Sequence, residues 1–374
     1  MLLALGIYMI VPTIPLYITD LGATKTQVGM VATAFYVSSI ITRLMINTVI
    51  AKVGRKRVLI AGFILSTIMM SSYGFARSVE TVAIMRVLQG MAFGTISTIS
   101  GAMAADFLPD SRRAQGIGYF GMGLVISMTI APALALYLRS NHGFIPVFLV
   151  AASTNLTAGI TVLFINEPRV NKPEPQQNAE EKIRAIRLRN VYDRKLIVPS
   201  IFVFIFGVCR SLDLNYITIF AEGRSLEQLP LYFTIQTVTM FCIRFFIGRV
   251  ADKKGRSWAL VPGGFAMLSS LIILSFTETN AVLLIGAFFS GLGSGMLSPN
   301  LQVWLFSVVA PEKRGLASAA YYNFIDIGGA LGAPLMGLIA EIFGFPFMFR
   351  AGACAAALYI MGYFIIGREK KIKT

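Results

Sequence analysis

Apolar residues fall in twelve long runs along the chain, separated by short polar segments. Each run is 17 to 26 residues long, which matches the roughly 20 residues that a helix needs to cross the hydrocarbon core of a bilayer. The pattern therefore predicts an all-α membrane protein. Its twelve spanning helices are expected at residues 2–18, 28–50, 58–76, 82–105, 116–138, 145–165, 196–220, 231–248, 258–276, 281–306, 316–340 and 346–366.

The second half of the chain repeats features of the first half. An apolar run with one arginine, followed by a basic turn built on a glycine, occurs twice at an offset of 201 residues. Other matched pairs have offsets of 201 or 202: Arg43 and Arg244, Gly54 and Gly255, Gly90 and Gly291, Gly94 and Gly295, and Pro132 and Pro334. We therefore expect two pseudo-symmetric six-helix bundles, at 1–166 and 196–374, joined by a polar cytoplasmic linker at 167–195. Internal repeats of membrane helices are typical of secondary transporters.

Composition supports the membrane assignment and explains the net charge. Hydrophobic residues make up 56% of the chain and charged residues 14%, with a net charge of +15. The loops alternate between two sides, and 24 basic residues fall on one side against four on the other. By the positive-inside rule, both termini are cytoplasmic in a cell (inner) membrane. The positive charge thus orients the protein in the lipid bilayer, and we expect no nucleic-acid partner.

The sequence has no cluster of histidine and cysteine residues of the kind that forms a metal or catalytic site. All three cysteines lie inside apolar runs, and the single histidine, His142, lies in a predicted outer loop. We expect no metal site, no cofactor and no enzymatic activity. Residues 1–18 lack the features of a signal peptide, and their missing basic flank suggests that a few residues precede Met1.

The second basic turn resembles a loop motif of the major facilitator superfamily. The segment from Gly248 to Arg256 reads GRVADKKGR, close to the family pattern G-x-L-a-D-R-x-G-R-R between the second and third helices. The first copy departs from this pattern at Asn47 and Ala51. The resemblance covers essentially the whole chain and implies alternating access, with a cytoplasmic gate. Its residues would be Gly248, Arg249, Asp252, Gly255 and Arg256, with Asp252 paired to Arg249 or Arg314.

Two further motifs narrow the resemblance. The segment Arg86-Val-Leu-Gln89-Gly90 is similar to the R-x-x-Q-G motif of the fourth helix. The fifth-helix motif of drug:proton antiporters, G-x-x-x-G-P-x-x-G-G, has lost its glycines around Pro132 but is better preserved between Gly332 and Gly337. The likeness is greatest to the twelve-helix drug or metabolite:proton antiporters, so efflux is favoured.

Two acidic residues and five arginines lie within the predicted spans. A charge in the hydrocarbon is costly, so each is expected to face a cavity or a partner. Asp326, near the midplane, is predicted to carry the coupled proton, and Asp213 is the second candidate. Arg210 precedes Asp213 by three residues, and the two either neutralise each other or form a switch.

Other residues are predicted to bind substrate or to support coupling. Arg86 is expected to bind an anionic group or to act on a carboxylate. Tyr322, one helical turn before Asp326, joins Tyr8 and Gln236 as candidates for the wall of the substrate site. The three remaining arginines, Arg43, Arg244 and Arg350, are predicted to hold helices in place near the membrane faces.

The sequence is interpreted as a monomeric secondary transporter that exports a small organic molecule, a drug or metabolite, in exchange for protons. One alternative is export of an anionic metabolite or an opine-type metallophore, because buried arginines outnumber buried acids five to two. Substrate uptake is another. A non-transporting membrane sensor, a protein of a different functional class, is a further alternative.

Overall fold

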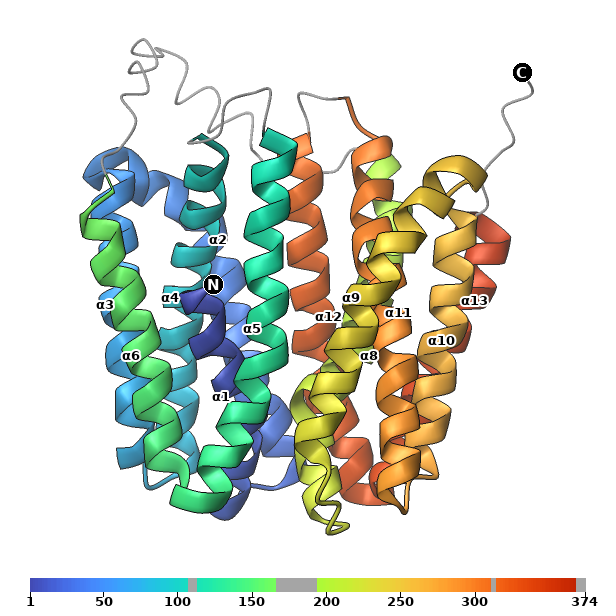
Figure 1. Ribbon diagram of the computed structural model, residues 1–374, viewed down its shortest axis with the longest axis horizontal. Coiled ribbons are helices and arrows are strands. Elements are labelled where there is room, and N and C mark those ends of the chain that lie inside the picture. The colour runs from blue at the N-terminus through green and yellow to red at the C-terminus, as the bar shows by residue number, and fades with distance from the viewer. Residues whose placement is uncertain (107–112, 166–193, 311–313, 368–374) are drawn as a thin grey trace.

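The computed structural model describes residues 1–106, 113–165, 194–310 and 314–367. Within these ranges the chain forms twelve long α-helices, which run along one common axis (Figure 1). They are α1 (Leu2–Asp20), α2 (Lys25–Val53), α3 (Arg55–Ser72), α4 (Val79–Asp106), α5 (Arg113–His142), α6 (Phe144–Leu163), α8 (Arg194–Glu222), α9 (Leu229–Lys254), α10 (Ser257–Ser275), α11 (Asn280–Ser307), α12 (Arg314–Phe343) and α13 (Phe345–Gly362).

The prediction of twelve membrane helices is confirmed. Among the described residues, eleven of these helices are long and apolar enough to cross a membrane, and the remaining helix, α5, has 30 residues. Most helices extend a few residues beyond the predicted apolar runs, because polar residues continue the helical hydrogen bonding past the hydrocarbon. The predicted linker lies almost wholly outside the described residues, and its boundaries stay a prediction.

The helices form two bundles, α1–α6 and α8–α13, with the same local geometry at equivalent positions. Gly54 and Gly255 both adopt a positive φ, of 94° and 93°, where α2 and α9 end. Side chains rarely tolerate this backbone conformation, so glycine is required at the turn. Gly143 and Gly344, again 201 residues apart, have φ values of 81° and 86°. The repeat seen in the sequence is therefore a repeat of backbone structure.

Paired glycines also set the helix packing within each bundle. A Cβ atom on Gly90 of α4 would lie 2.4 Å from the Phe35 carbonyl oxygen of α2. In the second bundle, a Cβ atom on Gly291 of α11 would lie 2.3 Å from the Gln236 carbonyl oxygen of α9. Small residues allow this close approach of membrane helices. The α2–α4 and α9–α11 contacts are thus equivalent.

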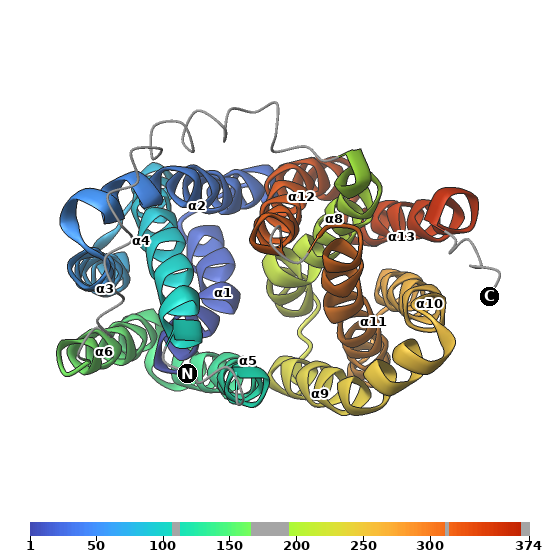
Figure 2. The ribbon, with the colours of Figure 1, turned by 90° about the horizontal axis from the view of Figure 1, so that it is seen from above.

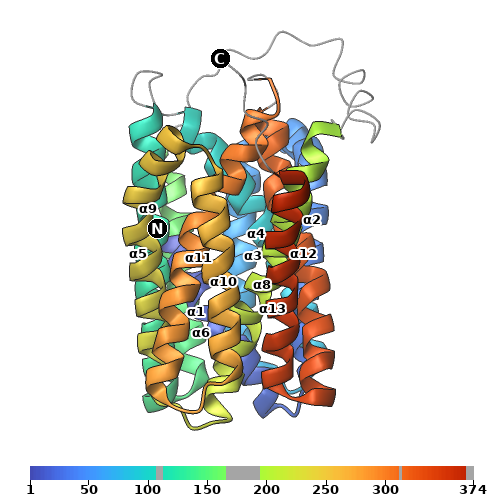
Figure 3. The ribbon, with the colours of Figure 1, turned by 90° about the vertical axis from the view of Figure 1, so that its right-hand side faces the viewer.

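The two bundles meet along specific helix pairs. Seen end-on, α2 lies beside α12 at one edge and α5 beside α9 at the other (Figure 2). Helices α1 and α8 also pack together between these edges. The side view places α10 and α13 on the outside of the second bundle, away from the first (Figure 3). The residues between α1 and α8 therefore lie at the centre of the molecule, and those between α2 and α12 lie along one edge of the contact between the bundles.

Candidate functional site

A row of polar contacts joins α2 of the first bundle to α12 of the second. The helices run antiparallel, so α2 residues of increasing number meet α12 residues of decreasing number. We call this row the seam; its pairs are Lys25 Nζ with the Ala340 carbonyl (3.0 Å), Thr26 with the Glu341 carboxylate (N at 3.0 Å, Oγ1 at 2.5 Å), Thr33 Oγ1 with the Ala330 carbonyl (2.6 Å), and Arg43 with Asp326. The seam begins at the end of the bundle that holds Lys25, here called the seam end. The opposite end, with the Gly54 and Gly255 turns, is called the basic end.

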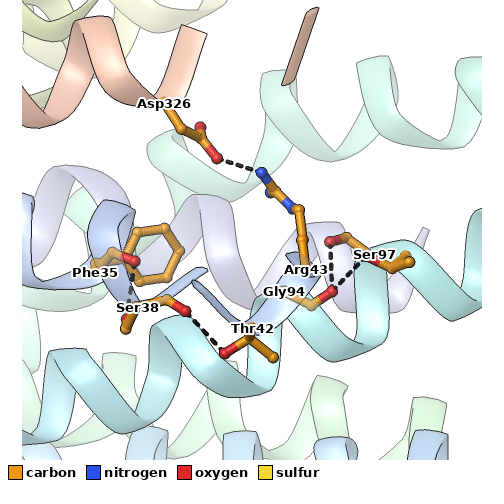
Figure 4. A network of polar contacts seen from close by, with 8 residues as sticks. Phe35, Ser38, Thr42, Arg43, Gly94, Ser97 and Asp326 are labelled. Carbon is orange, nitrogen blue, oxygen red and sulfur yellow. Dashed lines mark hydrogen bonds and ion pairs between the residues drawn. The ribbon is translucent and has the colours of Figure 1, made fainter. Parts of the chain in front are cut away.

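The last pair of the seam is an ion pair. Arg43 Nη1 donates to Asp326 Oδ2, and each side chain is only 15% exposed (Figure 4). The Arg43 guanidinium also lies 5.6 Å from the centre of the Phe93 ring and 6.0 Å from that of Tyr322. Moving either charge into the bilayer centre without a partner would cost about 2.5–3.5 kcal/mol on insertion scales. The two bundles thus share one buried pair of opposite charges.

This pairing corrects the interpretation of Arg43. The sequence predicted a role in holding a helix near a membrane face, whereas the structure places Arg43 against the carboxylate predicted to carry the proton. Sequence reasoning missed the pair because its members lie 283 residues apart. Tyr322, predicted to share a face with Asp326, does lie next to the pair and is 48% exposed.

Asp213 has a different environment, built from neutral donors. Its carboxylate accepts hydrogen bonds from Tyr232 Oη (3.1 Å), from Gln236 Nε2 (3.1 Å) and from the hydroxyl of Ser290. Gln236 Nε2 also lies 2.8 Å from Ser290 Oγ. These partners come from α9 and α11, so Asp213 links three helices of one bundle. Within the described part of the chain, no direct ion pair joins Asp213 to Arg210, although the two charges interact electrostatically.

Arg86 also lacks an acidic partner in the described ranges. It is 8% exposed and donates from Nη1 to Gln89 Oε1 at 2.6 Å, an oxygen that also accepts from the Tyr73 hydroxyl at 2.6 Å. Its guanidinium carbon lies 4.6 Å from the centre of the Phe35 ring. The R-x-x-Q-G motif therefore joins its own arginine and glutamine, and it positions a cation beside an aromatic face.

A second group of residues surrounds Tyr8 of α1. Arg210 of α8 and Arg244 of α9 lie close enough to interact electrostatically with the Tyr8 hydroxyl and with each other. Tyr321 of α12, which shares a 2.8 Å hydrogen bond with Ser298, interacts with both arginines. Two predicted site residues, Tyr8 and Arg210, are thus brought together. Arg244, predicted to be structural, lies in the same group.

A cavity at the basic end is lined by four of the predicted gate residues, Gly248, Asp252, Gly255 and Arg256. Its volume is about 560 Å³, and it lies between the last turns of α9 and α11. Asp252 lines it but is exposed, and no ion pair joins it to Arg249 within the described residues. Arg256 lies 4.3 Å over the Trp304 ring and donates to the Gly367 carbonyl at 3.3 Å. The Arg314 side chain, the other predicted partner, lies outside the described residues.

Comparison with known proteins decides the family. The model of the Major Facilitator Superfamily matches residues 1–229 and 222–374. The chain belongs to this superfamily. Superfamily members with similar sequences include the staphylopine export protein of Staphylococcus aureus (strain Mu50 / ATCC 700699), 25% identical over 94% of this chain and 90% of that protein. The quinolone resistance protein NorA of Staphylococcus aureus (strain MSSA476) is 21% identical over 91% of this chain and 88% of its own.

Solved superfamily structures have the same fold. The nucleoside transporter NupG superimposes with a TM-score of 0.77 at 13% identity, over 99% of this chain and 97% of its own. A bacterial homologue of the human lysosomal transporter Spinster, in an inward-facing and unoccupied conformation, gives 0.78 at 13% identity, over 97% and 94%. The chain is therefore a multi-pass membrane transporter by family and fold.

Proposed function

We propose that this protein exports a small organic molecule in exchange for protons, by alternating access, as a monomer in the cell (inner) membrane with both termini in the cytoplasm. The two relatives named above are an export protein and a drug-resistance protein. The excess of basic residues around the Gly54 and Gly255 turns assigns the basic end to the cytoplasm. The seam then closes the outer side.

The observation that carries the proposal is the ion pair between Arg43 and Asp326. It is the seam contact nearest the basic end, and it connects the two moving bundles. The pair requires an ionised carboxylate, so Asp326 releases its proton toward the cytoplasm once the outer side has closed, and the ion pair then forms. Opening the outer side separates α2 from α12 and exposes Asp326 to the outer solution, where it takes up a proton. One proton thus enters for each return of the empty transporter.

The gate residues act at the other end of the same cycle. Asp252 and Arg256 line the cavity at the basic end. In the outward-open conformation we expect Asp252 to close against a cation there, as the superfamily motif implies. Gly248 leaves room for that movement, because a Cβ atom on it would meet no atom of the described residues within 4 Å.

Everted membrane vesicles provide the test. Respiration acidifies the vesicle interior, a pH-sensitive dye reports the gradient, and a panel of compounds that includes a quinolone is added. We expect at least one compound to release stored protons in vesicles with the wild-type protein and not in vesicles without it. No compound-driven proton release and no compound uptake would refute the transport proposal.

The role of Asp326 is tested separately with matched variants. Asp326→Asn should abolish compound-driven proton release, whereas Asp20→Asn, which changes an exposed carboxylate at the end of α1, should leave it intact. Full gradient-dependent transport by Asp326→Asn would exclude Asp326 as the proton carrier. Asp213→Asn should slow transport without uncoupling it, because Asp213 is held by neutral donors within one bundle.

A further inference from the structure

Arg210 and Arg244 form a pair of like charges, and the carboxylate of Asp213, which interacts electrostatically with Arg210, balances only one of them. The two guanidinium groups interact electrostatically with each other. Within the described ranges neither has an ion pair, and the buried Nε of Arg244 has no hydrogen-bond partner. The nearby carboxylate of Asp213 already accepts three hydrogen bonds from neutral groups. Like charges at close range in a membrane interior are unfavourable unless an anion lies between them.

The internal repeat explains how this imbalance arises. Arg43 and Arg244 are equivalent residues of the two bundles, and Arg43 is neutralised by Asp326 of the opposite bundle. The residue equivalent to Asp326 lies 202 positions earlier, at the offset that relates Pro334 to Pro132, and it is Leu124. The second copy of the pair has therefore kept its arginine and lacks its carboxylate. A bound ligand can supply the carboxylate group that is missing at Leu124.

The surroundings of the two arginines suit an organic anion. Tyr8 and Tyr321, from different bundles, face the same cations and offer ring surface and hydroxyl groups. Arg244 also lines the cavity at the basic end, and on α9 it is the lining residue farthest from that end. The cavity volume, about 560 Å³, lies in the ordinary range for small-molecule sites, roughly 300–1,000 Å³. A molecule entering from the basic end would therefore reach Arg244 at the inner limit of the cavity.

We propose that Arg210 and Arg244 bind a carboxylate group of the transported molecule, with Tyr8 and Tyr321 against its apolar part. The substrate class is thus organic carboxylates. This inference rests on the proposed function, since it names the substrate class of the same site. It also assigns Arg244 a binding role that its twin Arg43 does not have.

Binding to the purified protein in detergent tests the inference without any proton gradient. The probes are isophthalate, a rigid aromatic dicarboxylate, and benzene-1,3-dimethanol, its uncharged analogue of the same shape, both measured by titration calorimetry. We expect isophthalate to bind and the diol to bind at least tenfold more weakly. Equal binding of the two probes, or no binding of isophthalate, would overturn the proposal. So would binding of a short-chain phosphatidylglycerol, but not isophthalate, in a manner that depends on Arg244, because the site would then hold lipid.

Substitutions test which residues bind isophthalate. Arg210→Gln and Arg244→Gln should each weaken isophthalate binding at least tenfold, while Arg350→Gln, which changes an arginine packed on Phe276 and Phe347, should not. Arg244→Lys controls for folding and should retain part of the affinity. Leu124→Asp keeps both arginines and supplies the missing carboxylate, so it should also weaken binding, unlike Leu124→Asn. Unchanged affinity in both arginine-to-glutamine variants would overturn the assignment. Binding with no compound-driven proton movement would instead refute only the coupling mechanism.

Discussion

Arg43 and Arg244 occupy equivalent positions in the two bundles, yet only Arg43 has a carboxylate partner in the described structure. The superfamily fold is thus nearly symmetric in its backbone and asymmetric in its charges. One arginine is used to join the bundles, and the other is left to interact with Arg210 and Tyr8. This difference separates a contact that governs conformation from one that is available to a ligand.

Removing one member of the Arg43–Asp326 pair should destabilise the protein. Arg43→Gln leaves a carboxylate that is 15% exposed without its cation, and breaking a buried pair in this way costs about 3–5 kcal/mol. Arg43→Gln combined with Asp326→Asn should recover much of this loss, because no charge is left unpaired. Thermal unfolding of the detergent-solubilised protein measures both effects.

The matched control is the exposed pair between Arg139 and Glu222, which also joins the bundles, at 2.6 Å. Arg139→Gln should cost at most about 1 kcal/mol, since solvent screens such pairs. Equal losses for Arg43→Gln and Arg139→Gln would show that burial does not determine the strength of these contacts.

Closing of the seam end should depend on Gly337. A Cβ atom on this residue would lie 2.4 Å from Tyr216 Oη and 2.5 Å from the Lys25 carbonyl oxygen of the other bundle. Gly337→Val should therefore push α12 away from α2 and favour the conformation that is open at the seam end. Thiol labelling of a cysteine introduced at Thr33, in a background without the native cysteines, should become faster.

Gly315→Val is the control for this effect, because it makes the same change on the same helix at a position where an added Cβ atom would meet no atom of the described residues within 4 Å. It should leave the labelling rate unchanged. If both variants label like the parent, the close approach at Gly337 does not hold the seam closed.

The fold was predictable from the sequence because its determinants are local or periodic. Apolar runs of spanning length predicted each helix, and matched residues such as Gly54 and Gly255 predicted the repeat. The candidate residues could also be chosen from the sequence, since a charge inside an apolar run is conspicuous. Their partners were not predictable: Arg43 meets Asp326, and Asp213 meets Ser290, only through packing between distant helices.

Ser290 should contribute to stability through its bond to Asp213. The hydroxyl is 2% exposed and serves both the carboxylate and Gln236. Ser290→Ala removes one donor from a buried charge, so we expect a loss of about 1–3 kcal/mol. Ser153→Ala removes an exposed hydroxyl that bonds only within its own helix, and surface changes of this kind stay within about 0.5 kcal/mol. Thermal unfolding compares the two, and similar losses would mean that the Asp213 network adds little.

Asp252 should affect transport more than stability. Its side chain is exposed and, within the described residues, has no ion pair in this conformation, so Asp252→Asn should change the free energy of unfolding by no more than about 0.5 kcal/mol. If Asp252 closes the basic end in the outward-open conformation, losing its charge removes a contact made in only one of the two states. A difference of about 1.4 kcal/mol between two states corresponds to a tenfold change in their ratio, so initial export rates should fall about tenfold. Asp20→Asn, at an exposed position outside the gate, should alter neither quantity. If Asp252→Asn exports at the wild-type rate, the second basic turn serves only to orient the protein in the membrane. The first basic turn, which has Ala51 in place of the aspartate, would then have the same role.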